Sequence, residues 1–143
     1  MVQVTKSTKT ISAKDIQRNW KLVDMKGKIL GRAANEIVTH LMGKNKVMFS
    51  PNMDTGDHVV VINAAKVLLS AKKSEKKEYT LFSGYPGGLR KVSFQSLMEK
   101  KPGEVVRHAV SGMLPKNKLR DQRLARLHIF ANEQHSFADK FTK

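Results

Sequence analysis

The sequence predicts an α/β fold, a three-layer α/β/α sandwich built on a mainly parallel sheet of about four strands. Short β-branched runs alternate along the chain with segments whose apolar residues recur at helical spacing. The run 58–62 is apolar almost throughout, which is typical of a central strand that is buried on both faces. The 143 residues suffice for one domain with a buried core, and they contain no repeat and no linker. We therefore expect a single domain over residues 1–143.

The first half of the chain predicts a strand, a helix and a second strand. The apolar run 20–24 is the first strand, and Gly27 marks the turn after it. The second strand covers 58–62, and Asn63 caps a short helical turn over 64–66. The helix between the strands has apolar residues at helical spacing and ends at a glycine: Leu30, Ala34, Ile37, Val38, Leu41 and Gly43.

A third strand is predicted over 79–82, where the residues are aromatic, β-branched and aliphatic. A polar, mostly cationic connector over 70–77 leads into this strand. The strand ends at the glycine-rich segment 83–88, which we expect to be a loop long enough to contact a partner.

The last third of the chain predicts three helices and a strand. A short helix around 94–98 stops near Pro102, which also helps to start a longer helix around 105–113. Asn117 is expected to cap a basic helix that runs to about Arg126. Alternating apolar residues over 127–131 then predict a final strand.

Composition predicts a polyanionic partner. The chain carries 27 Lys and Arg against 12 Asp and Glu, a formal net charge of +15. So one-sided a charge on a single domain is typical of proteins that bind nucleic acid. The alternative is a solvated surface without an anionic target, and such surfaces usually mix both signs.

Several classes of protein are excluded by what the sequence lacks. There is no cysteine, which excludes disulfides and thiolate zinc sites, and there is no apolar run long enough to span a membrane. We expect a cytoplasmic protein that needs no cofactor and no metal. Residues 1–12 are hydroxylic and basic, without an apolar signal core, and predict a flexible N-terminal arm; residues 132–143 predict a polar C-terminal tail.

Two motifs suggest chemistry, and each has a structural alternative. The glycine turn at 27–32 separates a strand from a helix, where backbone amides could hold a phosphate. It matches neither the dinucleotide fingerprint nor the Walker sequence, so close packing of strand and helix is the favoured interpretation. Asp54-Thr55-Gly56-Asp57 pairs two carboxylates, as aspartic proteases do. It precedes a strand and has no second copy, so we predict a turn or cap.

The five histidines are scattered along the chain. None has the spacing of a zinc site, and no nucleophile elbow accompanies them. We interpret them as ordinary helical or surface residues. His135, in the polar tail, has RNA contact as its functional alternative.

Candidate RNA-binding residues fall into basic segments and one glycine-rich loop. Lys116, Arg120 and Arg123 are spaced to share one helical face, and arginine forks onto phosphate oxygens. Tyr85 stands beside glycines that let a backbone approach RNA closely. The full predicted set is Lys28, Arg32, Lys44, Lys46, Lys72, Lys73, Lys76, Tyr85, Gly87, Gly88, Arg90, Lys91, Lys116, Lys118, Arg120, Arg123, Arg126 and His135.

Seven short motifs occur in an order and spacing that resemble a known family. They lie at Trp20 to Asp24, Gly27 to Ala34, Gly43-Lys44, Asp54 to Asp57, Asn63-Ala64, Ser83 to Gly88 and Gly112 to Pro115. Together they span roughly residues 18–135 and are similar to ribosomal protein L13 of the bacterial large subunit. Two departures stand out: Arg120-Asp121 where the family usually has Gly-Arg, and a tail at 132–137 without the usual His-Pro-His.

The resemblance implies a structural protein of the large ribosomal subunit and no enzyme. It implies binding to large-subunit (23S-type) ribosomal RNA, a role in early subunit assembly and in translation, and neighbouring ribosomal proteins as further partners. We expect phosphate and shape contacts, one copy per ribosome and no membrane association. The competing hypotheses are a translational regulator that binds messenger RNA and an α/β enzyme that binds a nucleotide.

Overall fold

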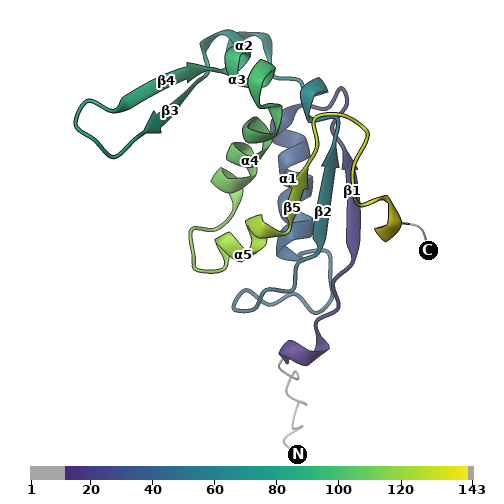
Figure 1. Ribbon diagram of the computed structural model, residues 1–143. Coiled ribbons are helices and arrows are strands. Elements are labelled where there is room, and N and C mark those ends of the chain that lie inside the picture. The colour runs from purple at the N-terminus through teal and green to yellow at the C-terminus, as the bar shows by residue number, and fades with distance from the viewer. Residues whose placement is uncertain (1–11, 142–143) are drawn as a thin grey trace, which may run out of the picture.

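The computed structural model describes residues 12–141 (Figure 1). All of the predicted N-terminal arm except Ser12 lies outside these residues. The elements, in order, are η1 (Ala13–Asp15), β1 (Trp20–Asp24), α1 (Leu30–Met42), β2 (His58–Ile62), η2 (Ala64–Lys66), α2 (Ala71–Lys76), β3 (Glu78–Phe82), β4 (Leu89–Ser93), α3 (Phe94–Lys100), α4 (Pro102–Met113), α5 (Arg120–Ala125), β5 (Leu127–Ile129) and η3 (Ala138–Lys140).

The central sheet is parallel and has the strand order β1-β2-β5. Trp20 pairs with His58 at one end of the β1–β2 ladder, and Val59 pairs with Leu127 in the β2–β5 ladder. The predicted α/β class with a parallel sheet is therefore confirmed, with three strands in the sheet instead of about four. The strands β1 and β2 have the predicted bounds, and β2 is the central strand, as its continuous apolar sequence indicates.

One face of the sheet carries the main hydrophobic core. Val23, Val59, Val61 and Leu127 alternate along their strands and pack with the buried faces of α1 and α4. These side chains are apolar at period two in the strands and at helical period in the helices, so folding buries all of them together. The helix α1 ends at Gly43, whose φ of 77° is accessible to glycine without steric strain.

The other face of the sheet carries aromatic and imidazole rings. Trp20, His58 and His128 lie on this face by the strand register, and Phe137 from the C-terminal segment stacks on Trp20 with ring centroids 5.1 Å apart. The predicted polar tail thus returns to the sheet and covers part of this face (Figure 1).

The predicted third strand does not join the sheet. It is β3, which pairs antiparallel with β4 in a separate two-stranded hairpin (Figure 1). Phe82 is paired with Leu89, and the turn between them contains Gly84 and Gly87 at positive φ. We call residues 78–93 the arm, because the hairpin projects away from the body of the protein.

The helices differ from the predictions in two places. The predicted connector over 70–77 contains a helix, α2. The predicted basic helix after Asn117 begins only at Arg120, with Leu119 at its N-cap, and Asn117 instead accepts a hydrogen bond from the Leu119 amide. The helices α3 and α4 occur where predicted, and Pro102 opens α4. Within residues 12–141, no helix is long and apolar enough to cross a lipid bilayer.

Candidate nucleic-acid interface

Apart from His135 in the C-terminal segment, the predicted RNA-binding residues belong to elements at two opposite ends of the sheet (Figure 1). The carboxyl ends of β1 and β2 lead to the start of α1 and to η2, which are joined by the bond from the Gly27 amide to the Lys66 carbonyl. The arm and α2 lie at this end. The loop 43–57 and the segment before α5 lie at the opposite end.

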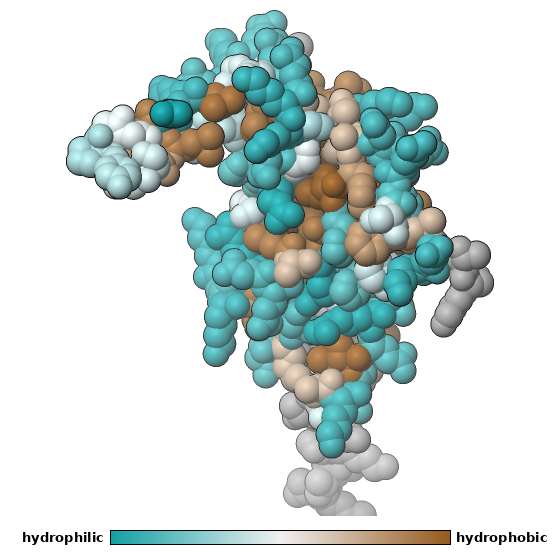
Figure 2. All heavy atoms as spheres, in the orientation of Figure 1, coloured by the Kyte–Doolittle hydropathy of each residue, from teal (hydrophilic) through white to brown (hydrophobic). Residues whose placement is uncertain are grey.

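The arm presents apolar and cationic side chains to solvent. Phe82 is 68% exposed and Tyr85 is 76% exposed, and Leu89 is also exposed. Arg90 is exposed on β4, whereas Lys91 pairs with Glu78 across the hairpin at 3.3 Å. Figure 2 shows apolar surface along the stem of the arm, a paler tip, and hydrophilic surface above the stem. The predicted loop residues and Arg90 therefore stand together at the most prominent projection of the molecule.

The base of the arm adds cations from α2. Lys72, Lys73 and Lys76 are all exposed, and α2 packs against α3, which directly follows β4. Their charges are only partly offset by Glu75 in the same helix. The structure thus brings the α2 lysines and the arm into one end of the molecule, as a polyanion-binding surface requires.

The start of α1 is not a phosphate cradle. The amides of Gly27, Lys28 and Leu30 donate to backbone carbonyls, and the amide of Leu30 reaches Leu68 at 2.9 Å. Lys28 also pairs with Glu36 at 3.2 Å. These bonds hold the turn against the segment after η2, in agreement with the structural interpretation of the glycine turn. Arg32 is exposed beside it.

At the opposite end of the sheet, Lys116 and Lys118 are exposed in the segment before α5. The predicted common helical face of Lys116, Arg120 and Arg123 is wrong, because Lys116 lies outside the helix. Arg120 is half-buried and donates from Nη2 to the backbone oxygen of Ser111 at 2.8 Å. Its guanidinium thus joins α5 to the end of α4.

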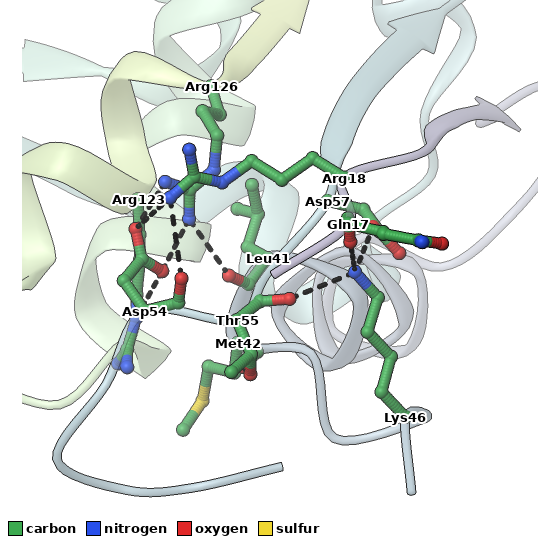
Figure 3. Close-up of polar contacts among 10 residues, drawn as sticks. All are labelled: Gln17, Arg18, Leu41, Met42, Lys46, Asp54, Thr55, Asp57, Arg123 and Arg126. Carbon is green, nitrogen blue, oxygen red and sulfur yellow. Dashed lines mark hydrogen bonds and ion pairs between the residues drawn. The ribbon is translucent and has the colours of Figure 1, made fainter. Parts of the chain in front are cut away.

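Arg123 and Arg126 point inward, contrary to the prediction that they face solvent. Arg123 is only 1% exposed, and both residues contact Asp54 (Figure 3). Arg126 places its two terminal nitrogens on the two carboxylate oxygens of Asp54, one of them at 2.6 Å. Nε of Arg123 lies 3.5 Å from the same carboxylate. A bidentate pair of this kind fixes the relative position of two segments that are 72 residues apart.

Lys46 also has an internal role. Its Nζ donates to the backbone oxygens of Gln17 at 2.6 Å and Thr55 at 3.0 Å, and it pairs with Asp57 at 2.5 Å (Figure 3). Asp57 in turn accepts a bond from the Asn19 amide at 2.9 Å. Asp54 therefore holds the loop 43–57 to neighbouring segments through arginines, and Asp57 holds it through the Asn19 amide and through Lys46 within the loop, which is more than the predicted turn or cap. Lys44, by contrast, is exposed.

The electrostatics keep Asp54 ionised. Burial favours its neutral form, but the hydrogen bonds and charge of Arg126, with the charges of Arg123 and Arg18, outweigh burial and hold the pKa of Asp54 below its ordinary value. The backbone near Asp54 is also closely packed. A Cβ on Gly56 would lie 1.7 Å from the backbone oxygen of Leu41. Only glycine fits there.

Two of the scattered histidines come together on the second face of the sheet. The rings of Trp20 and His58 stack with centroids 4.4 Å apart, and the ring of Phe137 lies 4.5 Å from that of His128. Burial, followed by nearby positive charges, lowers the pKa of both histidines. His135 accepts a bond from the Phe137 amide at 3.3 Å and packs near Phe130. His58 and His128 lie on the same face of neighbouring strands, but they are 70 residues apart in sequence. The sequence alone therefore does not bring them together.

No group of three His, Cys, Asp or Glu side chains that could hold a metal ion occurs within residues 12–141. The fold and its surface define a class: a small, strongly basic α/β protein with cations at both ends of its sheet and a projecting arm. The family signature of ribosomal protein L13 matches residues 18–136. The chain belongs to the ribosomal protein L13 family, which is a structural and non-enzymatic family, and the resemblance described above is confirmed.

Individual relatives agree with this assignment. The chain is 55% identical over 124 residues to large ribosomal subunit protein uL13 of Clostridioides difficile, with 87% of each chain covered. It is 49% identical over 121 residues to the protein of that name from Caldanaerobacter subterraneus, covering 85% of each. For the Syntrophotalea carbinolica protein the identity is 46% over 132 residues, with 92% of this chain and 93% of the relative covered.

Proposed function

We propose that this protein is a component of the large ribosomal subunit that binds large-subunit ribosomal RNA and assists an early step of subunit assembly. The relatives are named as large ribosomal subunit proteins. The observation that carries the RNA-binding proposal is the arm, where exposed aromatic residues and Arg90 stand next to the α2 lysines. RNA with unpaired bases suits this combination, since aromatic rings stack on bases and cations contact phosphates.

The second basic region supports the same proposal. Lys44, Lys116 and Lys118 are exposed at the far end of the sheet from the arm. A protein with cations at both ends can bind two RNA segments and fix their relative position, which is how a structural protein stabilises a folded RNA. Lys46, Arg123 and Arg126 bond within the protein, which supports a role for these three residues in holding this region together instead of in RNA contact.

Binding to purified large-subunit RNA across a salt series tests the proposal, with an unrelated structured RNA as competitor. If six to ten phosphates are contacted, the affinity should fall by about three to five orders of magnitude between 50 and 200 mM salt. The double variant Tyr85→Ser with Arg90→Gln should weaken binding by about tenfold or more, through lost stacking and a lost phosphate contact. The control is Lys21→Gln, which also removes one exposed positive charge, but from β1 instead of from the arm. Equal affinity for both RNAs at every salt concentration would contradict the proposal.

A further inference from the structure

The charges around Asp54 do not balance. Three guanidinium groups, those of Arg18, Arg123 and Arg126, surround a single carboxylate, so the cluster retains two positive charges (Figure 3). The neighbouring pair of Lys46 and Asp57 is neutral and contributes no compensation. Excess charge that is partly removed from water is unfavourable unless an anion approaches it.

The three arginines differ in how firmly the protein holds them. Arg126 occupies both carboxylate oxygens of Asp54, and its side chain is 9% exposed. Arg18 is 42% exposed and lies 3.8 Å from the carboxylate. Within residues 12–141 its guanidinium donates one hydrogen bond, from Nη2 to the backbone oxygen of Asp54 at 3.4 Å. Because a guanidinium carries five N–H donors, most of those of Arg18 have no acceptor among the residues that the structure describes.

The positive field of this cluster extends beyond the pairs themselves. The pKa of His58 is lowered first by burial and then by the charges of Arg126, His128 and Arg18, against a smaller opposing effect of Asp57. Lys116 and Lys118 are exposed at the same end of the sheet. The side chain of Arg18 is therefore the exposed member of a cluster that already carries an excess of positive charge.

We propose that Arg18 binds a phosphate group of the RNA and that the buried arginines behind it supply the field that attracts this phosphate. Asp54 is the positioning residue, since its carboxylate and backbone oxygen set the direction of the Arg18 guanidinium. This inference rests on the proposed RNA-binding function and adds a contact that the sequence pattern did not single out. Arg18 precedes β1 as an isolated arginine, whereas the sequence prediction relied on runs of cations and on helical spacing.

The test compares the wild-type protein with Arg18→Gln, Arg18→Lys and the control Lys14→Gln in binding to large-subunit RNA over a salt series. Arg18→Gln should weaken binding by about tenfold or more and reduce the slope of log affinity against log salt by about one. Arg18→Lys should restore the slope and only part of the affinity, because lysine keeps the charge and loses the fork. Lys14→Gln removes the same charge from a nearby exposed residue and should change both quantities less.

The possible results separate the two proposals. If the wild-type protein prefers large-subunit RNA and Arg18→Gln behaves like Lys14→Gln, the inference about Arg18 is overturned while the proposed function stands. If the wild-type protein shows no preference for this RNA, the proposed function fails and the inference fails with it. A second measurement needs no variant: the side-chain Nε–Hε resonance of Arg18 in the labelled wild-type protein should shift on RNA titration, and an unchanged resonance would overturn the inference.

Discussion

Asp54 shows how one carboxylate organises a basic protein. It is 9% exposed and accepts bonds or ion pairs from arginines that precede β1 and that lie on and after α5. The chain has 12 acidic residues against 27 Lys and Arg. The carboxylate of Asp54 therefore offsets the mutual repulsion of the arginines around it. The residue thereby connects the loop 43–57 to the C-terminal third of the chain.

Asp54→Asn should destabilise the fold strongly. The substitution leaves Arg123 and Arg126 buried without their counter-charge, and removal of one partner of a buried ion pair costs about 3–5 kcal/mol. Denaturant unfolding measures this free energy. Asp121→Asn, on the exposed surface of α5, is the control and should cost less than about 1 kcal/mol. Equal effects of the two substitutions would show that the buried pairs contribute little.

Gly56→Ala should be harmful for a steric reason. A Cβ there would overlap the backbone oxygen of Leu41, and backbone cannot move aside as a flexible side chain can. We expect a loss of about 1–3 kcal/mol in the free energy of unfolding, the usual range for overpacking. Gly31→Ala is the matched control, because nothing lies within 4 Å of its Cβ position and alanine is the better helix former. Similar unfolding midpoints for the two variants would contradict this account.

At the scale of elements, the arm is the least supported part of the fold. The strands β3 and β4 pair only with each other, and two-stranded hairpins are marginally stable in water. Packing is confined to the base of the hairpin, where Tyr79 contacts the ring of His108. The arm amides should therefore exchange with solvent faster than those of β2, which open only with the whole domain. Hydrogen exchange in the free protein measures this difference, and equal protection of β2 and the arm would show that the arm folds as part of the core.

The elements differ in how far the sequence could reveal them. The bounds of α1 and β2 follow from local apolar patterns, because each buries most of its apolar side chains. Strand β1 buries only Val23, and its bounds follow from the short apolar run before Gly27. Strands β3 and β4 are both exposed or half-buried, so burial imposes no pattern on either sequence. Aromatic and β-branched residues still indicate β3, whereas β4 contains mainly charged and polar residues and has no such signal. The inward direction of Arg123 depends on Asp54, a contact distant in sequence. Because α5 covers only Arg120–Ala125, apolar spacing around Arg123 gives no local sign of its inward position.

At the scale of the whole molecule, the free energy of unfolding should decrease in two separate ranges as the pH is lowered. His58 and His128 have pKa values below the ordinary 6.5 in the folded state, so below pH 6.5 the unfolded chain binds protons that the folded protein excludes. Asp54 acts in the same direction below its ordinary value of 3.8, where the unfolded carboxyl protonates first. Both contributions are fully present at pH 8.

Unfolding midpoints from pH 8 to pH 3 at constant ionic strength measure these two losses. His128→Gln should flatten the profile below pH 6.5 without changing the range below pH 3.8, because it removes one of the two imidazoles whose pKa is lowered in the folded protein. A wild-type profile that is flat over the upper range would show that the imidazoles are protonated in the folded protein as readily as in the unfolded chain.

The stacking of Trp20 gives the molecule an optical reporter of its own. Trp20 is the single tryptophan of the chain, and its indole lies between a strand residue, His58, and the C-terminal Phe137. Its emission therefore responds to departure of the C-terminal segment as well as to unfolding. Phe137→Ala should shift the emission to longer wavelength while the far-ultraviolet circular dichroism stays unchanged. Fluorescence together with circular dichroism can thus show whether the chain end leaves the sheet when RNA binds.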